Sequence, residues 1–107
     1  MSRYFEWDQA KAALNLRKHG IFFQAATEVF DDPFALVEQD RIENGQLRWQ
    51  TIGMTADGLP LLLVAHTVRF QDAGDEEPAE LIRIISARRA DRKERKRYEH
   101  NRQTQAG

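Results

Sequence analysis

Apolar residues recur with helical spacing in the first part of the chain. Residues 9–20 place alanines and leucines on one face, and Asp8 and Gly20 are residue types that cap the two ends of a helix. Residues 21–33 repeat this spacing up to Pro33, which cannot continue a helix. The pattern therefore predicts two helices near the N-terminus.

Beyond this region, apolar residues alternate with polar ones or form short continuous runs, as they do in strands. Strands are predicted at residues 34–42, 47–55, 61–70 and 81–88, separated by turns at 43–46 and 56–60 and by an acidic loop at 71–80. A short aromatic segment, residues 4–8, is predicted to be an edge strand. Because strands joined by short turns are commonly antiparallel neighbours, we expect a mainly antiparallel sheet of three or four strands.

The last segment is predicted to be a basic helix. Asp91 and Glu94 have the D-x-x-E spacing of a capping box, in which each side chain accepts a hydrogen bond from the other's backbone N–H. We expect this helix to reach about Arg102 and residues 102–107 to be a frayed tail. The order of elements predicts one α+β domain over residues 1–107, with two N-terminal helices packed on the sheet and a basic helix at the end.

The composition excludes several classes of protein. The 107 residues include no cysteine, which rules out disulfides and thiolate metal sites. The three histidines show no ligand spacing, and Walker, dinucleotide and G-x-S-x-G motifs are missing, so we expect neither a metal nor a cofactor. No apolar run reaches the roughly 20 residues that span a bilayer, and the N-terminus lacks the apolar core of a secretory signal. We therefore expect a cytoplasmic protein with no membrane contact.

The net charge of −1 conceals a strong asymmetry. Residues 1–80 contain seven lysines and arginines against fourteen aspartates and glutamates, a net −7. Residues 81–107 contain nine against three, a net +6. A polyanion such as RNA would meet the basic end rather than the average charge.

Arginines recur on the predicted strands near this basic end. Strict alternation over 81–88 puts Arg83 on one face of the strand and Arg88 on the other, unless the strand bends. Arg69 and Arg48 lie on the two preceding strands, so several guanidinium groups could converge on one concave face and bind phosphate oxygens. The alternative for each arginine is an ordinary ion pair. Arginines scattered over separate surfaces, each paired with a carboxylate, would contradict the hypothesis of a phosphate site.

Four further side chains are candidates for contact with a nucleic acid. His19 can transfer a proton near neutral pH and Lys18 can bind a phosphate, although both residue types also suit the C-terminal end of a helix. Trp7 can stack on a base or close one edge of the core. Tyr98 can contact RNA or fix the last helix against the sheet.

Two stretches of the sequence resemble a known family. FEWDQAKAALNLRKHGIFFQAATEVFDDP at 5–33 and RIISARRADRKERKRYE at 83–99, with Ile52–Gly53 between them, are similar in order and spacing to the BrnT toxin family. The pair of motifs W-D…N…KHGI-F and RIISAR…ER..YE is specific, and the resemblance covers about residues 4–99. The acidic loop is longer than the shortest in the family.

The resemblance implies a RelE-like α+β fold and the toxin of a type II toxin–antitoxin pair, a ribonuclease that halts translation without a metal. It also implies a BrnA-like antitoxin of ribbon-helix-helix type and, through that antitoxin, contact with the operator DNA of an operon that the complex represses. Under this hypothesis, the catalytic residues are Arg69, Arg83, Arg88 and His19. The RNA-binding residues are Lys18, Arg48, Trp7 and Tyr98. A non-catalytic module that binds a partner through its basic C-terminal face and a direct DNA-binding protein remain as alternatives.

Overall fold

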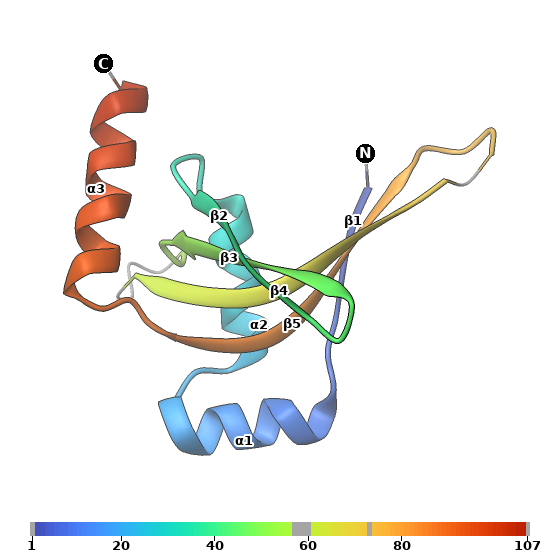
Figure 1. The fold of residues 1–107 in the computed structure, drawn as a ribbon, viewed down its shortest axis with the longest axis horizontal. Helices are drawn as coiled ribbons and strands as arrows, with labels where there is room; N and C mark the ends of the chain where they lie inside the picture. The colour runs from blue at the N-terminus through green and yellow to red at the C-terminus, as the bar shows by residue number, and fades with distance from the viewer. Residues whose placement is uncertain (1, 57–60, 73, 107) are drawn as a thin grey trace.

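Helices and a single β-sheet make up the protein in the computed structural model, which describes residues 2–56, 61–72 and 74–106 (Figure 1). The elements are β1 (Ser2–Glu6), α1 (Gln9–His19), α2 (Phe23–Ala26), the 3₁₀ helix η1 (Thr27–Asp31), β2 (Leu36–Glu43), β3 (Gln46–Gly53), β4 (Leu62–Gln71), β5 (Ala79–Arg89) and α3 (Arg92–Ala106). The strands lie in the order β1-β5-β4-β3-β2. The turn predicted at 56–60 lies, apart from Ala56, outside the described residues.

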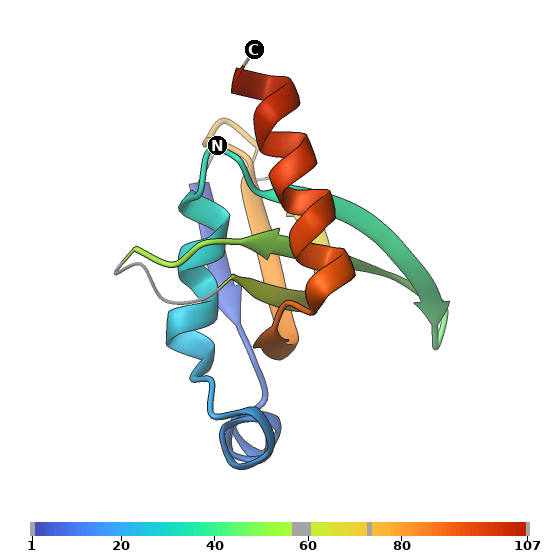
Figure 2. The same cartoon turned by 90° about the vertical axis from the view of Figure 1, so that its left-hand side faces the viewer.

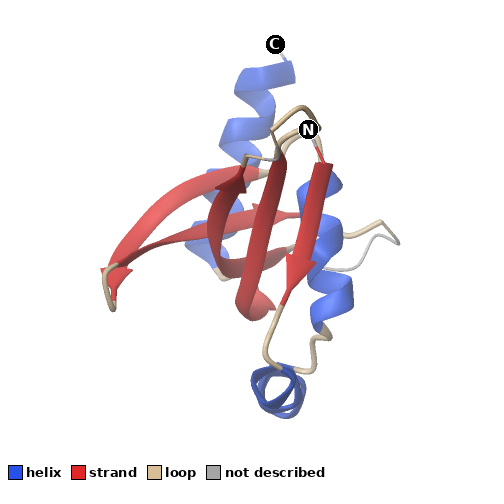
Figure 3. Ribbon diagram, turned by 90° about the vertical axis from the view of Figure 1, so that its right-hand side faces the viewer, coloured by secondary structure: helices blue, strands red, loops and turns tan. Residues whose placement is uncertain are grey.

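The sheet is mainly antiparallel, as expected, but it is mixed because one pair of strands is parallel. Strands β2 to β5 form an antiparallel meander, as their short connections predict. Strand β1 is an edge strand, as expected, but it pairs with β5 in parallel (Figure 3). Glu6 of β1 lies opposite Arg83 of β5. The predicted α+β class is therefore confirmed, whereas the predicted number of three or four strands is wrong, because β1 makes a sheet of five.

The first helix has the caps that the sequence predicts. The Asp8 carboxylate accepts hydrogen bonds from the backbone N–H groups of Ala10 and Lys11, at 2.8 and 3.2 Å. At the other end, Gly20 has φ +71°, a left-handed conformation that glycine adopts without a Cβ clash.

The predicted second helix is divided in two. Helix α2 has only four residues and continues as η1, which is tighter. The Thr27 hydroxyl donates to the Gln24 carbonyl at 2.7 Å where the two helices meet. Val29 of η1 lies so close to β3 that a Cβ built on Gly53 would be 2.9 Å from the Val29 carbonyl oxygen. The expectation of one helix over 21–33 is therefore only partly correct.

The basic helix α3 begins with the predicted capping box. The backbone N–H of Asp91 donates to Glu94 Oε1 and that of Glu94 donates to Asp91 Oδ1, each at 2.8 Å. The helix reaches Ala106, past Arg102, where we expected it to end. The Arg102 guanidinium lies 5.1 Å from the centre of the Phe34 ring, a cation–π contact that holds the last turns of the helix near the start of β2.

The two faces of the sheet are covered unequally (Figure 2). One face, which we call the helix face, packs against α2 and η1 and forms the main core: Phe23, Ala26, Val29, Leu62, Val64, Ile82, Ile84 and Ala87. The other, which we call the open face, is covered at one end by α3, where Ile52, Leu63 and Tyr98 belong to a second core.

A β-bulge decides which side chains of β5 reach the open face. Ala65 of β4 pairs with Ser86, and the next residue, His66, pairs with Ile84, so Ile85 has no partner on β4. The extra residue reverses the alternation after Ile84. Arg83 and Arg88 therefore share a face, and the prediction from strict alternation that they lie on opposite faces is wrong.

Where β1 ends, a side chain of α1 takes over the edge of β5. The buried Asn15 amide donates from Nδ2 to the Ala87 carbonyl at 2.9 Å, and Asn15 Oδ1 accepts from the Ala87 N–H at 3.0 Å. Asn15 Nδ2 also donates to the Ile21 carbonyl at 3.0 Å, which ties the loop after α1 to the same point. One amide thus satisfies both backbone groups of a strand residue and attaches α1 beside β5 (Figure 1).

The helix face also contains a buried histidine. His66 is 2% exposed, its Nε2 lies 2.8 Å from the Thr51 hydroxyl, and its ring contacts Phe30 edge-on at 4.9 Å. Burial lowers the pKa of His66 to about 4, so the ring is neutral at physiological pH. His66 is therefore part of the core, as its position within an apolar strand predicts.

Candidate functional site

Arginines from three neighbouring strands share the open face. Arg83 lies opposite Thr67 of β4, and Arg69 lies two residues further along that strand. Because Trp49 of β3 pairs with His66, the preceding residue, Arg48, lies beside Thr67 on this face. Arg88 reaches the same face after the bulge, opposite Leu63. The fold thus gathers the four arginines that the sequence analysis selected.

One carboxylate from the first strand lies between two of these arginines. Glu6 Oε1 accepts a hydrogen bond from Arg69 Nη2 at 3.0 Å and lies 3.7 Å from Arg83 Nη1. The side chains of Arg69, Arg83 and Glu6 are 58%, 43% and 37% exposed. We call these three residues the Glu6 cluster. It is an ion-pair group in contact with solvent at the edge of the sheet.

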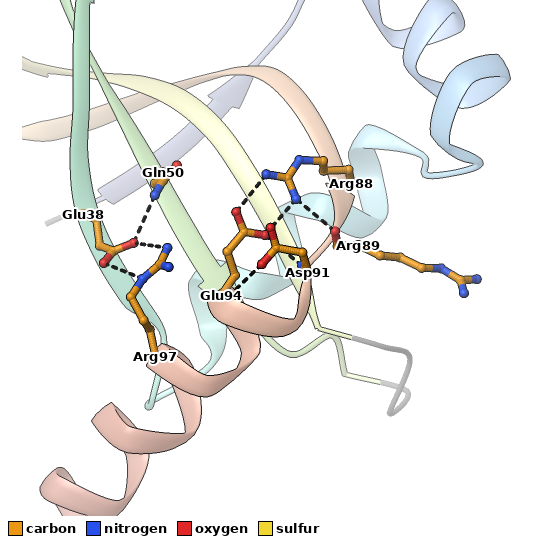
Figure 4. A network of polar contacts seen from close by, with 7 residues as sticks. All are labelled: Glu38, Gln50, Arg88, Arg89, Asp91, Glu94 and Arg97. Carbon is orange, nitrogen blue, oxygen red and sulfur yellow. Dashed lines mark hydrogen bonds and ion pairs between the residues drawn. The ribbon is translucent and has the colours of Figure 1, made fainter.

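The fourth arginine is held differently. Arg88 donates from Nη1 and Nη2 to the two oxygens of Glu94, both at 2.8 Å, and from Nη1 to the Arg89 carbonyl at 3.2 Å (Figure 4). Glu94 is the capping-box residue and is 7% exposed. The hydrogen bonds from Arg88 lower the pKa of Glu94, and those to Glu94 raise the pKa of Arg88. Arg88 thus fastens the start of α3 to the end of β5.

A second set of contacts holds α3 against the middle of the sheet. Arg97 donates to both carboxylate oxygens of Glu38 at 3.2 Å, and Gln50 donates to the same carboxylate at 3.0 Å (Figure 4). Arg48, at the outer end of β3, forms an ion pair with Glu43 at 3.0 Å. Each of the four candidate arginines therefore has a carboxylate partner, although all four share one face.

The predicted residues of α1 meet β5 at a cavity. Lys18 and His19 line a space of about 250 Å³ together with Lys11, Leu14, Asn15, Ile85 and Ser86. Ser86 lies on the open face, opposite Ala65. The bulge and the Asn15 contact bring His19 and a strand hydroxyl to one cavity, although 66 residues separate them in sequence.

The two aromatic candidates pack against the two cores, Trp7 partly buried and Tyr98 fully buried. Trp7 contacts Phe23 edge-on at 6.0 Å and packs against the core of the helix face. Tyr98 is 2% exposed and donates its hydroxyl to Asp32 Oδ2 at 2.6 Å; burial, with Asp32 as the smaller cause, raises the pKa of Tyr98 to about 12. These positions support the alternatives that the sequence left open, a core edge for Trp7 and an anchor of α3 for Tyr98.

Sequence reasoning missed the carboxylates. Glu6 received no role, because its position beside two arginines depends on the parallel pairing of β1 with β5. Glu94 was recognised only as a helix cap, because its contact with Arg88 depends on the bulge. The D-x-x-E motif three residues after Arg88 was the one available signal for that contact.

The fold and the site define an α+β protein with an arginine-bearing sheet face beside a cavity that contains lysine and histidine. A family model described as a ribonuclease toxin, BrnT, of type II toxin–antitoxin systems matches residues 7–94. The chain belongs to this family, which confirms the resemblance noted in its sequence. No curated protein matches the chain.

No helix in residues 2–56, 61–72 and 74–106 is long and apolar enough to cross a membrane. Within the same ranges, no three histidine, aspartate or glutamate side chains lie close enough together to hold a metal ion.

Proposed function

We propose that this chain is a metal-independent endoribonuclease toxin that binds and cleaves RNA on the open face. The gathering of Arg48, Arg69, Arg83 and Arg88 on that face is the observation that carries the proposal. Membership of a family of ribonuclease toxins supports the substrate class. The basic C-terminal region adds an electrostatic attraction for a phosphate backbone.

The chemistry fits these side chains. In RNA cleavage without a metal, the ribose 2′-hydroxyl loses its proton and attacks the adjacent phosphorus, and negative charge builds up on the phosphorane oxygens. The bond from phosphorus to the 5′-oxygen then breaks, which leaves a 2′,3′-cyclic phosphate and a 5′-oxygen that takes up a proton. Arginines stabilise that charge, but they do not deprotonate in proteins, so another group must carry the proton. His19 is our candidate for this role, and Lys18 beside it would hold a neighbouring phosphate.

The carboxylate partners limit which arginines are available. Ion pairs that remain exposed contribute about 0–1 kcal/mol, so a phosphate can displace Glu6 from Arg69 and Arg83 at little cost. Arg88 is held by two short hydrogen bonds to a shielded carboxylate that also caps α3. We therefore assign phosphate contact to Arg69 and Arg83, with Arg48 in support, and assign to Arg88 the positioning of α3 beside them.

The partner remains part of the proposal. A type II toxin has a protein antitoxin; we propose that it is a BrnA-like ribbon-helix-helix protein and that the complex represses its own operon through the antitoxin. In this scheme the toxin reaches operator DNA only through its partner, and it acts in the cytoplasm, where messenger RNA is translated.

The alternative is a non-catalytic binding module. It is favoured by the fact that each of the four candidate arginines is paired with a carboxylate. One experiment separates the two. Purified wild-type chain is incubated with single-stranded RNA in the presence of a chelator, beside the His19→Gln variant. Cleavage by the wild type and a rate at least about 100-fold lower in the variant would support the assignment. Intact RNA in the wild-type reaction would support the binding module instead.

A further inference from the structure

We infer that Glu6 occupies, in the free protein, the place that a phosphodiester oxygen takes when RNA binds. The inference rests on the proposed function, because it assigns a ligand to the open face. It adds a residue to which neither the family description nor the sequence pattern gives a role. Glu6 also precedes residues 7–94, the part of the chain that the family model matches.

The geometry of the Glu6 cluster matches an anion site for two guanidinium groups. A single oxygen, Glu6 Oε1, is 3.0 Å from Arg69 Nη2 and 3.7 Å from Arg83 Nη1. A non-bridging phosphate oxygen forms the same kind of contact, since guanidinium N–H groups bind carboxylate and phosphate oxygens with similar geometry. The carboxylate therefore keeps two flexible side chains directed at one point in the absence of a ligand.

The origin of the three side chains makes the cluster a built feature of the fold. Arg69 comes from β4, Arg83 from β5 and Glu6 from β1, so the group spans three adjacent strands. Arg83 and Glu6 are direct neighbours across the parallel pair, which fixes their separation through the backbone. The backbone positions from which Arg69 and Arg83 extend thus stay fixed when the carboxylate turns away.

Exposure makes an exchange of anions possible. Glu6 is 37% exposed and ends a strand at the edge of the sheet, so its side chain can turn into water when a phosphate arrives. The Glu94 side chain, which is 10% exposed, has no such freedom because it also accepts from the Asp91 N–H. The carboxylate that can leave is therefore Glu6, and its departure exposes two positive charges to one phosphate.

The test compares two variants that change net charge equally on opposite faces. Glu6→Gln removes the internal anion of the cluster. Glu80→Gln removes the partner of Arg3, a 2.8 Å ion pair that lies on the helix face beside Phe30. The probe is a fluorescent single-stranded 2′-O-methyl oligoribonucleotide, which cannot be cleaved, and its affinity is measured by anisotropy between 50 and 300 mM salt (~50–300 mM spans the range where phosphate contacts dominate).

E6Q is expected to bind this probe roughly 3- to 10-fold more tightly than wild type, whereas E80Q should change the affinity by less than about 2-fold. The slope of log K against log salt should become steeper by about 0.7 in E6Q, the value for one further phosphate contact on a single strand. Equal effects of the two variants, or weaker binding by E6Q, would overturn the inference. Unchanged binding with much slower cleavage of ordinary RNA would also overturn it, because Glu6 would then act in proton transfer.

Failure of this inference is distinguishable from failure of the proposed function. If the wild type cleaves RNA and E6Q binds the probe like E80Q, only the role inferred for Glu6 is overturned. A wild type that leaves RNA intact while E6Q binds more tightly overturns the nuclease proposal and keeps the phosphate site. If E6Q melts well below wild type, Glu6→Asp is used in its place. The shorter carboxylate reaches the two arginines less well, so this variant should bind the probe more tightly than wild type and less tightly than E6Q. Weaker binding than wild type would overturn the inference.

Discussion

Two arginine–carboxylate groups lie on one face of the same sheet and differ in what surrounds them. Arg88 and Glu94 share two hydrogen bonds of 2.8 Å at the start of α3, where Glu94 is shielded and also caps the helix. Arg69, Arg83 and Glu6 meet through one oxygen at the edge of the sheet, with every side chain more than one-third exposed.

The comparison shows that the role of an ion pair, structural or ligand-binding, follows from its exposure and from the other hydrogen bonds that its carboxylate accepts. A carboxylate that accepts three hydrogen bonds in a shielded position, as Glu94 does, cannot leave without loss of structure. A carboxylate that accepts two contacts in water contributes little to stability and can be replaced by another anion. The first group is therefore part of the framework, and the second is available for ligands.

The largest expected effect concerns RNA cleavage. Arg83→Ala or Arg69→Ala should lower the rate of cleavage by about 100- to 1000-fold, the usual effect of removing one donor that stabilises developing negative charge. Arg41→Ala is the control, because Arg41 is 68% exposed on β2 at the opposite edge of the sheet. The rates are measured with a quenched fluorescent RNA. Similar cleavage rates in all three variants would contradict the assignment of phosphate contact to Arg69 and Arg83.

The next effect concerns stability. Glu94→Ala should lower the free energy of unfolding by about 2–3 kcal/mol, since it removes a helix cap worth about 1 kcal/mol and charge-assisted hydrogen bonds worth about 1.5–3 kcal/mol, partly offset by rehydration of Arg88. Glu6→Ala should change it by less than about 1 kcal/mol. Urea unfolding of both variants provides the measurement. Equal losses would show that exposure does not separate the two groups.

Acid should weaken the Arg88–Glu94 group. Arg88 holds the pKa of Glu94 below its usual value of 4.5, so the stability that Glu94 contributes is present above about pH 4.5 and is lost as the pH falls further. The difference in melting temperature between wild type and Glu94→Gln should therefore shrink below pH 4.5. Both proteins keep His66, so its titration cancels in the difference. A constant difference down to pH 3 would contradict this assignment (~pH 3 lies below the unfolded pKa of Glu).

The smallest effect is the coupling between Glu6 and Arg69. A double-mutant cycle should give about 0.2–1 kcal/mol at low salt and almost nothing in about 1 M salt, where charges are screened within about 3 Å. The same cycle for Glu94 and Arg88 should retain most of its larger value at high salt. If the Glu6–Arg69 coupling energy stays unchanged at high salt, this pair is structural, like Arg88 and Glu94.

Most of the fold could be predicted from local patterns. The capping residues predicted α1 and α3, because Asp8, Gly20 and the Asp91–Glu94 box bond to residues close to them in sequence. The short turns predicted the antiparallel meander. The parallel position of β1 and the division between α2 and η1 could not be predicted in this way, because they depend on contacts between segments far apart in the chain.

The candidate site was predictable in its residue types and not in its geometry. A strongly basic end and arginines on successive strands were visible in the sequence. The side of β5 that each arginine faces depends on the single unpaired residue Ile85, which no local pattern marks. The cavity that His19 and Ser86 both line, and the position of Glu6 opposite Arg83, likewise became visible only in the folded chain.

The amide of Asn15 has a consequence for assembly. Along the outer margin of β5, β1 pairs with the first half, and Asn15 occupies both backbone groups of Ala87 in the second. In the described part of the chain, the opposite margin, β2, pairs with β3 alone and exposes Val37 and Ile42. The outer side of β1 also pairs with no other strand in the described residues, so the sheet keeps one strand edge at β1 and one at β2. Asn15 therefore shields only the stretch of β5 beyond β1 from pairing with a strand of another molecule, because both backbone groups of Ala87 are already bonded.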